Sequence, residues 1–296
     1  MIKKVTSLYY NGKDNGIILD DAYDLYKRNQ YIKYIKEKSI NYLYCQDLDM
    51  NLLASFPDME FITIPEDAEN IEGVYNLKLL TGLEITANKL KLLDLSYFSN
   101  LEYLVIHDYS SKQNLLINCK QLKYLCIVHS DITSLKSILI NYNLESLRLD
   151  FCYNLKTLNG IESLKHLNKI ELDYCLRLEN ISDIQFTANS LKEFIITDCN
   201  KIQELSTILG KLSELETLYI STFQTNSVNK LPSIEFIKNL TKLKNFMTDY
   251  KIEDGNLKPL LNIENVDILK FYKHYNLQKD SFAYRGSNCY MLGIDL

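Results

Sequence analysis

His129 and Asp108 are the residues whose types and spacing come nearest to catalytic chemistry. Each lies seven residues into one of two neighbouring copies of a short pattern, which begin at Leu122 and Leu101. Stacked copies would bring the two side chains together, and a base beside an orienting carboxylate can activate a nucleophile. Cys126 precedes His129 by three residues, a spacing that points the two side chains to different faces of a strand. We therefore interpret His129 and Asp108 as a surface pair and expect no catalytic residues.

Cys152, Cys175 and Cys199 form a regular series that could suggest a metal site. Their spacings of 23 and 24 residues follow the length of the repeat, and each lies eight residues after the first apolar residue of its copy. A thiol is small, partly apolar and a weak donor, so it suits a buried turn. The sequence has no GxGxxG, GxxxxGK[ST], HExxH or CxxC motif. We interpret the cysteines as structural and expect no metal and no cofactor.

The repeated pattern is apolar-x-x-apolar-x-apolar, and its fullest form is LESLRLDFCYNLKTL from residue 144. Copies begin at Ile40, Met59, Leu80, Leu101, Leu122, Leu144, Leu167, Leu191, Leu215, Leu243 and Val266, with a degenerate first copy expected at Val5. Successive starts from Ile40 lie 19, 21, 21, 21, 22, 23, 24, 24, 28 and 23 residues apart. A period of roughly 20 to 29 residues with this internal spacing resembles the leucine-rich repeat.

The resemblance implies an α/β repeat fold, the leucine-rich-repeat solenoid or horseshoe. A parallel β-sheet would line the concave face, and short helices, 3-10 turns and extended segments would form the convex face. The step-of-two half of each copy predicts a short strand with alternate side chains pointing inward. Because one coil cannot bury its own apolar face, the coils stack and share a core. The family usually places Asn at the inward turn after the strand, and we expect Asn88 to fill that place in the Leu80 copy.

Three segments are expected: an N-terminal cap with a helix over residues 1–39, about ten repeats over residues 40–275, and a C-terminal cap over residues 276–296. Residues 19–38 are predicted to form the helix, with Asp20 or Asp21 as its N-cap. Its inward-facing residues would be Ala22, Leu25, Tyr26, Ile32 and Ile35. Residues 281–296 are predicted to form two short strands that cover the open edge of the sheet.

Composition favours some partners over others. The formal net charge of -5 argues against nucleic acid, because phosphate binding favours a basic face. No apolar run approaches the length of a membrane span, and no apolar run of a secretory signal follows the first lysines. The 7 cysteines show no small disulfide framework, which fits a reducing compartment. We expect a cytoplasmic protein with no membrane partner, and the sequence leaves its oligomeric state open.

Residues two, four and six positions after the start of each copy are predicted to form columns on the concave face. The columns are aromatic and apolar in the N-terminal half and charged in the middle, a combination typical of a protein-binding surface. The last copy, counted from Val266, places Ile268 there. The predicted partner-binding residues are Tyr103, His107, Tyr124, His129, Arg148, Asp150, Glu171, Asp173, Tyr174, Asp198 and Tyr219. Aromatic residues also favour strands for packing alone, so a flank or the convex face is the alternative site.

The last copies carry a further resemblance, to a group of bacterial intracellular leucine-rich-repeat proteins. Their V/I-x-D-G-D/N-L-x-P-L element is matched by Ile252, Asp254, Gly255, Asn256, Leu257, Pro259 and Leu260, and their H-Y ending by His274 and Tyr275. Members of that group are similar to proteins encoded beside secreted toxins, which suggests immunity. Asp-Gly is also good turn chemistry, so a capping turn explains the motif without a binding site.

Three functions follow from these patterns. The first is a non-enzymatic protein–protein interaction scaffold that binds a protein partner through the concave face. The second is an immunity protein that neutralises a cognate bacterial toxin, whose basic surface would meet Asp150, Glu171, Asp173 and Asp198. The third, which we favour least, is an enzyme or a secreted effector.

Overall fold

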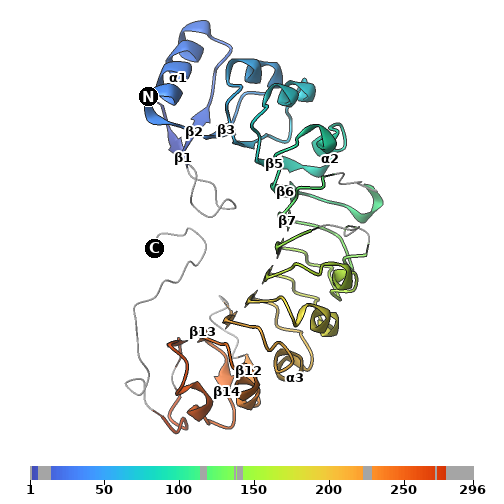
Figure 1. Cartoon of the computed structure of the whole chain (residues 1–296), viewed down its shortest axis with the longest axis vertical. Helices are drawn as coiled ribbons and strands as arrows, with labels where there is room; N and C mark the ends of the chain where they lie inside the picture. The colour runs from blue at the N-terminus through green and yellow to red at the C-terminus, as the bar shows by residue number, and fades with distance from the viewer. Residues whose placement is uncertain are drawn as a thin grey trace. The chain divides into compact units, whose positions relative to one another are not determined.

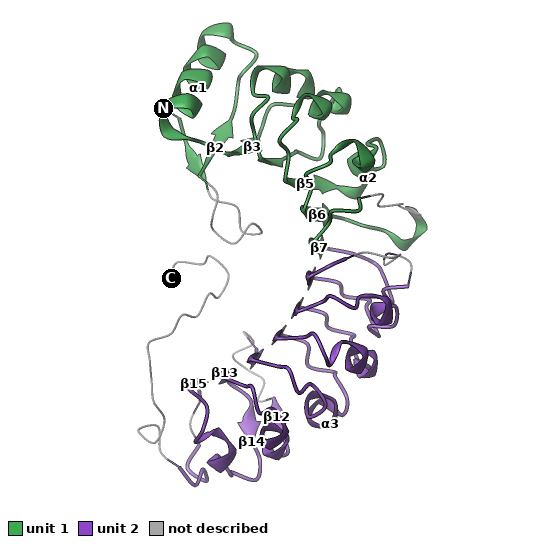
Figure 2. Ribbon diagram, in the orientation of Figure 1, with its two compact units in different colours: residues 1–128, 291–296 green, residues 129–290 purple. Residues whose placement is uncertain are grey.

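The computed structural model describes residues 2–5, 15–113, 119–136, 138, 143–222, 229–270 and 272–277. The chain divides into two compact units: unit 1 runs up to Val128 and unit 2 begins at His129 (Figure 2). In each unit the strands of the large sheet line one side, and the helices and 3-10 turns lie on the other (Figure 1). The sequence did not predict this division, because the repeat pattern continues across it.

The described part of unit 1 contains seven strands of one sheet in chain order. Its elements are β1 (Lys4–Val5), β2 (Gly16–Leu19), α1 (Leu25–Lys38), β3 (Tyr42–Cys45), η1 (Met50–Ser55), β4 (Phe61–Thr63), η2 (Ile71–Asn76), β5 (Gly82–Thr86), α2 (Ala87–Leu90), η3 (Leu95–Tyr97), β6 (Tyr103–His107), η4 (Ser111–Gln113) and β7 (Tyr124–Val128). β1 and β2 are antiparallel, and from β2 to β7 each strand is parallel to the next.

Unit 2 continues the pattern with the sheet order β8-β9-β10-β11-β13-β15. Its elements are β8 (Ser146–Asp150), η5 (Ile161–Ser163), β9 (Lys169–Asp173), η6 (Ser182–Thr187), β10 (Glu193–Thr197), α3 (Leu205–Leu209), β11 (Thr217–Ser221), β12 (Lys230–Leu231), η7 (Glu235–Asn239), β13 (Asn245–Thr248), β14 (Lys251–Ile252), η8 (Lys258–Leu260) and β15 (Asn265–Ile268). The short strands β12 and β14 pair in a separate parallel sheet.

The core follows from the period of two within each strand. In unit 2 the residues three and five positions after the start of each copy point into the core of the solenoid, and each is at most 7% exposed. The first of these two columns consists of Leu147, Ile170, Phe194, Leu218, Phe246 and Val266, which stand in register on adjacent strands. Burying such side chains stabilises each coil only when its neighbours are present. The predicted leucine-rich-repeat solenoid, with its parallel sheet, is confirmed.

The cysteine series lies in this core as buried free thiols. Cys175 Sγ donates to the carbonyl oxygens of Leu149 (3.6 Å) and Asp173 (3.7 Å), and Cys199 Sγ does the same on the next coil with Leu172 (3.7 Å). The thiols therefore satisfy backbone carbonyls of their own turn and of the preceding coil. This is the structural role that the sequence predicts for them.

Asn88 does not fill the inward place in its copy. The chain enters helix α2 directly after β5, so Ala87 becomes the buried residue (0% exposed) and Asn88 faces outward. The prediction was wrong because an immediate helix advances the inward position by one residue.

The N-terminal helix is shorter than predicted. α1 begins after Asp24, whose side chain accepts a hydrogen bond from the Lys27 amide (2.8 Å), so neither Asp20 nor Asp21 is its N-cap. Leu25 and Tyr26, predicted to face inward, are 68% and 75% exposed. Leu19 lies in strand β2, which is parallel to β3.

Two predicted starts of repeat copies, at Val5 and at Val266, are wrong. The first strand that joins the parallel ladder is β2, whereas Val5 lies in the antiparallel strand β1. In the last copy, Asn245 pairs with Asn265 and Thr248 with Ile268. The copy therefore begins at Ile263 rather than Val266, and Ile268 points into the core (5% exposed).

The Asp254–Gly255 turn and its hydrogen-bonded neighbours Ile252, His274 and Tyr275 form a structural unit that we call the clasp. Gly255 has φ 65°, and Asp254 Oδ1 accepts a hydrogen bond from the Asn256 amide (3.0 Å), which closes the turn. His274 Nε2 lies 2.8 Å from the Ile252 carbonyl oxygen, and the Ile252 amide donates to the Tyr275 hydroxyl (3.0 Å). The motif thus holds the end of the described repeats, as the capping-turn interpretation predicts. The predicted strands within 281–296 lie outside the described residues.

Candidate functional site

The open face of the sheet is the best candidate for a functional surface; we use this name for the face opposite the core, formed by positions two, four and six after the start of each copy. In unit 2 its central column is Arg148, Glu171, Ile195, Tyr219, Met247 and Asp267, in register on six strands. The column therefore changes from charged side chains on β8 and β9 to apolar and aromatic ones on β10 and β11.

The charged part of this face is an ordered ion-pair network. Arg148 Nε donates to both carboxylate oxygens of Asp150 (2.9 and 2.8 Å), and Arg148 Nη1 lies 3.3 Å from Glu171 Oε2. Lys169 Nζ lies 2.7 Å from Glu171 Oε1 and 3.4 Å from Glu193 Oε2. The side chains of Arg148 and Asp150 are only 11% and 2% exposed. Buried partners of this kind depend on each other, because either charge alone would lack compensation.

Three carboxylates lie on adjacent coils at the end of the strands: Asp150, Asp173 and Asp198. Asp150 pairs with Arg148, and Asp198 accepts a hydrogen bond from Thr222 Oγ1 (2.5 Å). Asp173 is 6% exposed, and its Oδ1 atom has no hydrogen-bond partner among the residues that the structure describes. The pKa of Asp173 is raised to about 7, mainly by burial and then by the neighbouring carboxylates of Asp150, Asp198 and Glu171, against an opposing effect of Arg148. This carboxyl is thus the one in the row whose charge the chain compensates least.

An aromatic row, His129, Phe151 and Tyr174, follows the strands on three successive coils. Phe151 and Tyr174 are stacked with ring centroids 5.0 Å apart and planes at 14°, and the His129 ring lies 4.9 Å from Phe151. All three have φ between 50° and 54°, a left-handed conformation that is unfavourable for bulky residues. Asp108 and Asp198 share this conformation, so it belongs to the turn that directly follows the strand in each of these coils.

Backbone hydrogen bonds hold the aromatic row in its left-handed conformation. The His129 amide donates to the Asp150 carbonyl (3.0 Å) and the Phe151 amide to that of Asp173 (2.9 Å). The Tyr174 amide donates to Thr197 in the same way (3.0 Å). Each turn thus adds one backbone hydrogen bond to the sheet ladder. This bond to the neighbouring coil stabilises the strained backbone of the turn.

Unit 1 has a hydrogen-bonded chain across four strands of its open face. Tyr42 Oη lies 2.8 Å from Thr63 Oγ1, which donates to Glu84 Oε2 (2.8 Å), and Glu84 Oε1 lies 2.8 Å from His107 Nε2. The column pattern of the sequence does not predict the His107–Glu84 pair, because His107 lies six residues after the start of its copy and Glu84 lies four residues after the start of the preceding one.

The predicted site residues fall in both units. Tyr103, His107 and Tyr124 belong to unit 1, and the other eight belong to unit 2. Tyr103 is half-buried between Phe61 and Tyr124, at ring-centroid distances of 6.0 and 5.7 Å. Tyr124 is only 6% exposed and offers little surface to a partner. Asp108 and His129 occupy equivalent positions after β6 and β7 with φ 56° and 53°, but they belong to different units.

In unit 2, the arrangement brings together Arg148, Asp150 and Glu171 as an ion-pair network, and Asp173, Tyr174 and Asp198 as the neighbouring strand ends. Tyr219 lies two strands beyond Glu171, beside Ile195, and both side chains are partly exposed. Their role in binding stays a prediction.

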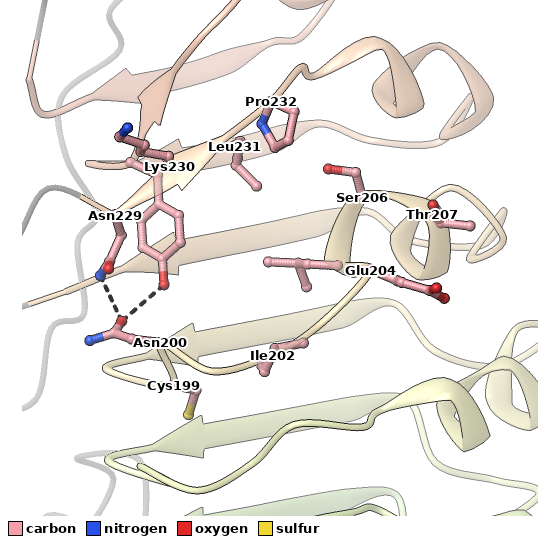
Figure 3. Close-up of a pocket in the computed structure, with 12 residues that line it drawn as sticks. Cys199, Asn200, Ile202, Glu204, Ser206, Thr207, Asn229, Lys230, Leu231 and Pro232 are labelled. Carbon is pink, nitrogen blue, oxygen red and sulfur yellow. Dashed lines mark hydrogen bonds between the residues drawn. The ribbon is translucent and has the colours of Figure 1, made fainter.

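A pocket on the flank of unit 2 was not predicted (Figure 3). It has a cavity volume of about 280 Å³ and lies between the coil of Cys199 and strand β12. Asn200 Oδ1 accepts hydrogen bonds from Asn229 Nδ2 (2.6 Å) and the Tyr250 hydroxyl (3.2 Å) at its wall. The one sequence signal for it is the long spacing of 28 residues between Leu215 and Leu243, because extra chain beside a regular coil leaves space.

Within the described ranges, no cluster of three or more His, Cys, Asp or Glu side chains is placed to hold a metal ion. In the same part of the chain, no helix is long and apolar enough to cross a membrane.

Comparison with known proteins shows similarity at the level of structure. No family model matches the sequence, and no curated protein matches it. Among solved structures, internalin C2 of Listeria monocytogenes is 20% identical with a TM-score of 0.46, over 74% of this chain and 83% of that one. An internalin (InlF) of the same species is 18% identical with a TM-score of 0.41, over 77% and 72%. TLR13 in its complex with ssRNA13 is 14% identical with a TM-score of 0.51.

The TLR13 match covers 82% of this chain but only 36% of the TLR13 chain. At these identities the likeness concerns the fold. Together with the recurring apolar pattern, the parallel ladder of one strand per coil and the shared core, the TLR13 likeness identifies the fold of this chain as a leucine-rich-repeat solenoid.

Proposed function

We propose that this chain is a non-enzymatic interaction scaffold that binds a protein partner through the open face of its sheet. The observation that carries the proposal is the juxtaposition, in unit 2, of the partly exposed Ile195 and Tyr219 with the Lys169–Glu171–Arg148 network. Protein interfaces combine an apolar or aromatic centre with a polar rim, and Tyr and Arg contribute much of their binding energy. Preformed ion pairs keep the charged rim in one geometry, which reduces the entropy lost on binding.

The cytoplasm is the proposed compartment. Cys152, Cys175 and Cys199 stand on successive coils as free thiols, and a reducing environment keeps thiols in that state.

A finer form of this proposal is an immunity protein for a bacterial toxin. It is supported by the row of Asp150, Asp173 and Asp198, which would complement a basic surface. The Asp254–Gly255 clasp does not add support, because its hydrogen bonds explain it structurally. Expression of a candidate toxin with this chain should restore growth of cells that the toxin alone kills, and unchanged killing would contradict the immunity function.

The test of the scaffold function is an affinity capture from native lysate, compared between two variants. The double variant Ile195→Glu/Tyr219→Ala alters the open face, and Phe186→Ala removes an aromatic side chain that is 53% exposed on the opposite side. We expect the captured protein to be lost with the first variant and retained with the second. The reverse pattern would place the binding surface on the convex side and contradict the proposal.

A further inference from the structure

The charges on the open face of unit 2 do not balance. The cations Arg148 on β8 and Lys169 on β9 lie among a larger set of carboxylates, which are Asp150, Glu171, Asp173, Glu193 and, directly after β10, Asp198. Both cations already have carboxylate partners at 2.7 to 3.4 Å. A partner that brings a positive charge would therefore be favoured here over one that brings a negative charge.

The uncompensated negative charge of this face is concentrated at Asp173. Asp173 shares its face of strand β9 with Lys169 and Glu171, whereas Ile170 and Leu172 point into the core. It is more than nine-tenths buried, and its Oδ1 atom has no hydrogen-bond partner in the described structure. An unsatisfied buried carboxyl oxygen is costly, so a donor supplied from outside would remove that cost.

The surroundings select the kind of cation. The described carboxylates do not converge as metal ligands would, which disfavours a bound metal ion. Beside Asp173, the stacked rings of Phe151 and Tyr174 form an apolar wall held by strained backbone. A ligand with an apolar stem and a charged tip fits both features, and Arg and Lys side chains have that form.

We propose that the open face of unit 2 contains a recognition site for a cationic side chain, arginine or lysine, of a protein partner, in which Asp173 pairs with the incoming charge and Phe151 and Tyr174 contact its aliphatic stem. This rests on the proposed scaffold function and specifies the chemistry of the partner. The site would fix the register of the partner on the sheet, because the other two carboxylates of the row are already engaged.

The site has a pH dependence that a purely structural carboxyl would not give to binding. With a pKa of about 7, Asp173 is mostly protonated at pH 6 and mostly ionised at pH 8. A cation binds the ionised form, so its apparent affinity falls with the ionised fraction, by about tenfold from pH 8 to pH 6. The groups that face Asp173 are Arg148, Asp150, Glu171 and Asp198.

The test uses the full chain and short blocked peptides. Acetyl-Gly-X-Gly-amide, with X as Arg, Lys, citrulline or Glu, would be titrated into isotope-labelled protein, and the amide signals of Asp173, Tyr174 and Phe151 followed by NMR at pH 6 and pH 8. We expect saturable shifts with the Arg or Lys peptide, about tenfold weaker at pH 6, and none with citrulline or Glu. The preferred cation distinguishes a guanidinium site from an ammonium site.

Two variants make the result decisive. Asp173→Asn is isosteric and removes a buried charge, so it should fold, and it should abolish both the binding and its pH dependence. Glu179→Gln changes the net charge equally at an exposed position and should bind like the unmodified chain. No saturable shift with either cationic peptide, or equal binding by Asp173→Asn, overturns the cation site. A protein captured through Tyr219 but insensitive to Asp173→Asn also overturns it, while leaving the scaffold function in place.

Discussion

The ring of Tyr174 lies almost parallel to that of Phe151, with centroids 5.0 Å apart and planes at 14°, although both residues have positive φ. Because an aromatic pair contributes beyond the area it buries, the stack offsets part of the backbone strain. The pair also forms one wall of the proposed cation site.

A double-mutant cycle on Phe151→Leu and Tyr174→Leu measures this contact. We expect a coupling energy of about 0.5–1.5 kcal/mol in the free energy of unfolding, measured by urea denaturation. Phe151→Leu combined with Phe186→Leu is the control, because Phe186 lies in η6 and is 53% exposed, and its effect should be additive. Additivity for both pairs would mean that the stack does not stabilise the fold.

Asp173 should make the stability of the protein depend on pH. Its pKa is about 7 in the folded state and about 3.9 in an unfolded chain, so folding opposes its ionisation. The free energy of unfolding should therefore fall as the pH rises from about 4 to 7 and change no further through this group.

Asp173→Asn removes this effect. The variant should exceed the original chain in stability by roughly 2–4 kcal/mol at pH 8, and the difference should approach zero near pH 4. Urea denaturation at pH 4, 6 and 8 measures it, with Glu179→Gln as the control for net charge. A variant that is less stable at pH 8 would show that Asp173 has a stabilising partner as an anion.

Arg148 should be among the most sensitive positions of the open face. Arg148→Met leaves the carboxylate of Asp150, which is 1% exposed, without its ion pair, and we expect a loss of about 3–5 kcal/mol. The double variant Arg148→Met/Asp150→Asn should recover most of it. Lys242→Met breaks the exposed pair with Glu214 and should cost less than about 1 kcal/mol. Equal losses for Arg148→Met and Lys242→Met would refute the buried network.

The sequence predicts the repeating part of this structure well because the core depends on local periodicity. Leu147 and Leu149 stand two residues apart on a strand, and the same spacing recurs in register on the neighbouring coils. The sequence predicts the two ends of the repeat array poorly, because the strands there are set by pairing with residues that are distant in the chain. Leu19 was assigned to a helix, but it pairs with β3. LNIENVDILKF, residues 261–271, fits the apolar pattern from Ile263 and from Val266. The pairing of Asn265 with Asn245 and the hydrogen bond from the Asn265 amide to the Lys244 carbonyl (2.9 Å) decide between them.

The open face was predictable as a set of columns but not as a site. Alternation along each strand predicts which residues lie on the open face. The exposed fraction of each side chain depends instead on how far the side chains of neighbouring coils extend over it. Tyr124 occupies a predicted open-face position and is nevertheless 6% exposed. The positive φ of Phe151 and Tyr174 has no signal in residue type, since Gly or Asn would be expected there.

The buried thiols should resist alkylation in the folded protein. Hydrogen bonding with Cys152 and Cys199, together with burial, raises the pKa of Cys175 well above its ordinary value, and the thiolate is the reactive form. Iodoacetamide followed by peptide mass mapping should therefore leave Cys152, Cys175 and Cys199 unmodified until urea is added. Rapid native labelling of Cys175 would contradict the closed core of unit 2.

Gly255 should be essential to the clasp that ends the described repeats. Its φ is 65°, and a Cβ atom there would lie 2.6 Å from the His274 carbonyl oxygen and 2.8 Å from the His274 ring. Gly255→Ala should therefore destabilise the protein by at least about 1–3 kcal/mol through backbone strain alone, with a further loss from the clash. Hydrogen exchange at the Ile252 and Asn276 amides, which bond to Tyr275 and Gly255, should become faster.

Gly210→Ala is the matched control for Gly255→Ala. Gly210 has φ -61° at the end of α3, and a Cβ atom there would meet the nearest side chain at 3.3 Å. Because Ala adopts this helical conformation readily, the stability should stay within about 1 kcal/mol of the original, and exchange at Ile252 should not change. If both substitutions had the same effect, the contact between Gly255 and His274 would not hold the clasp. If only Gly255→Ala accelerated exchange at Ile252, the sequence motif would be explained by the close approach of two backbones, with no need for a ligand.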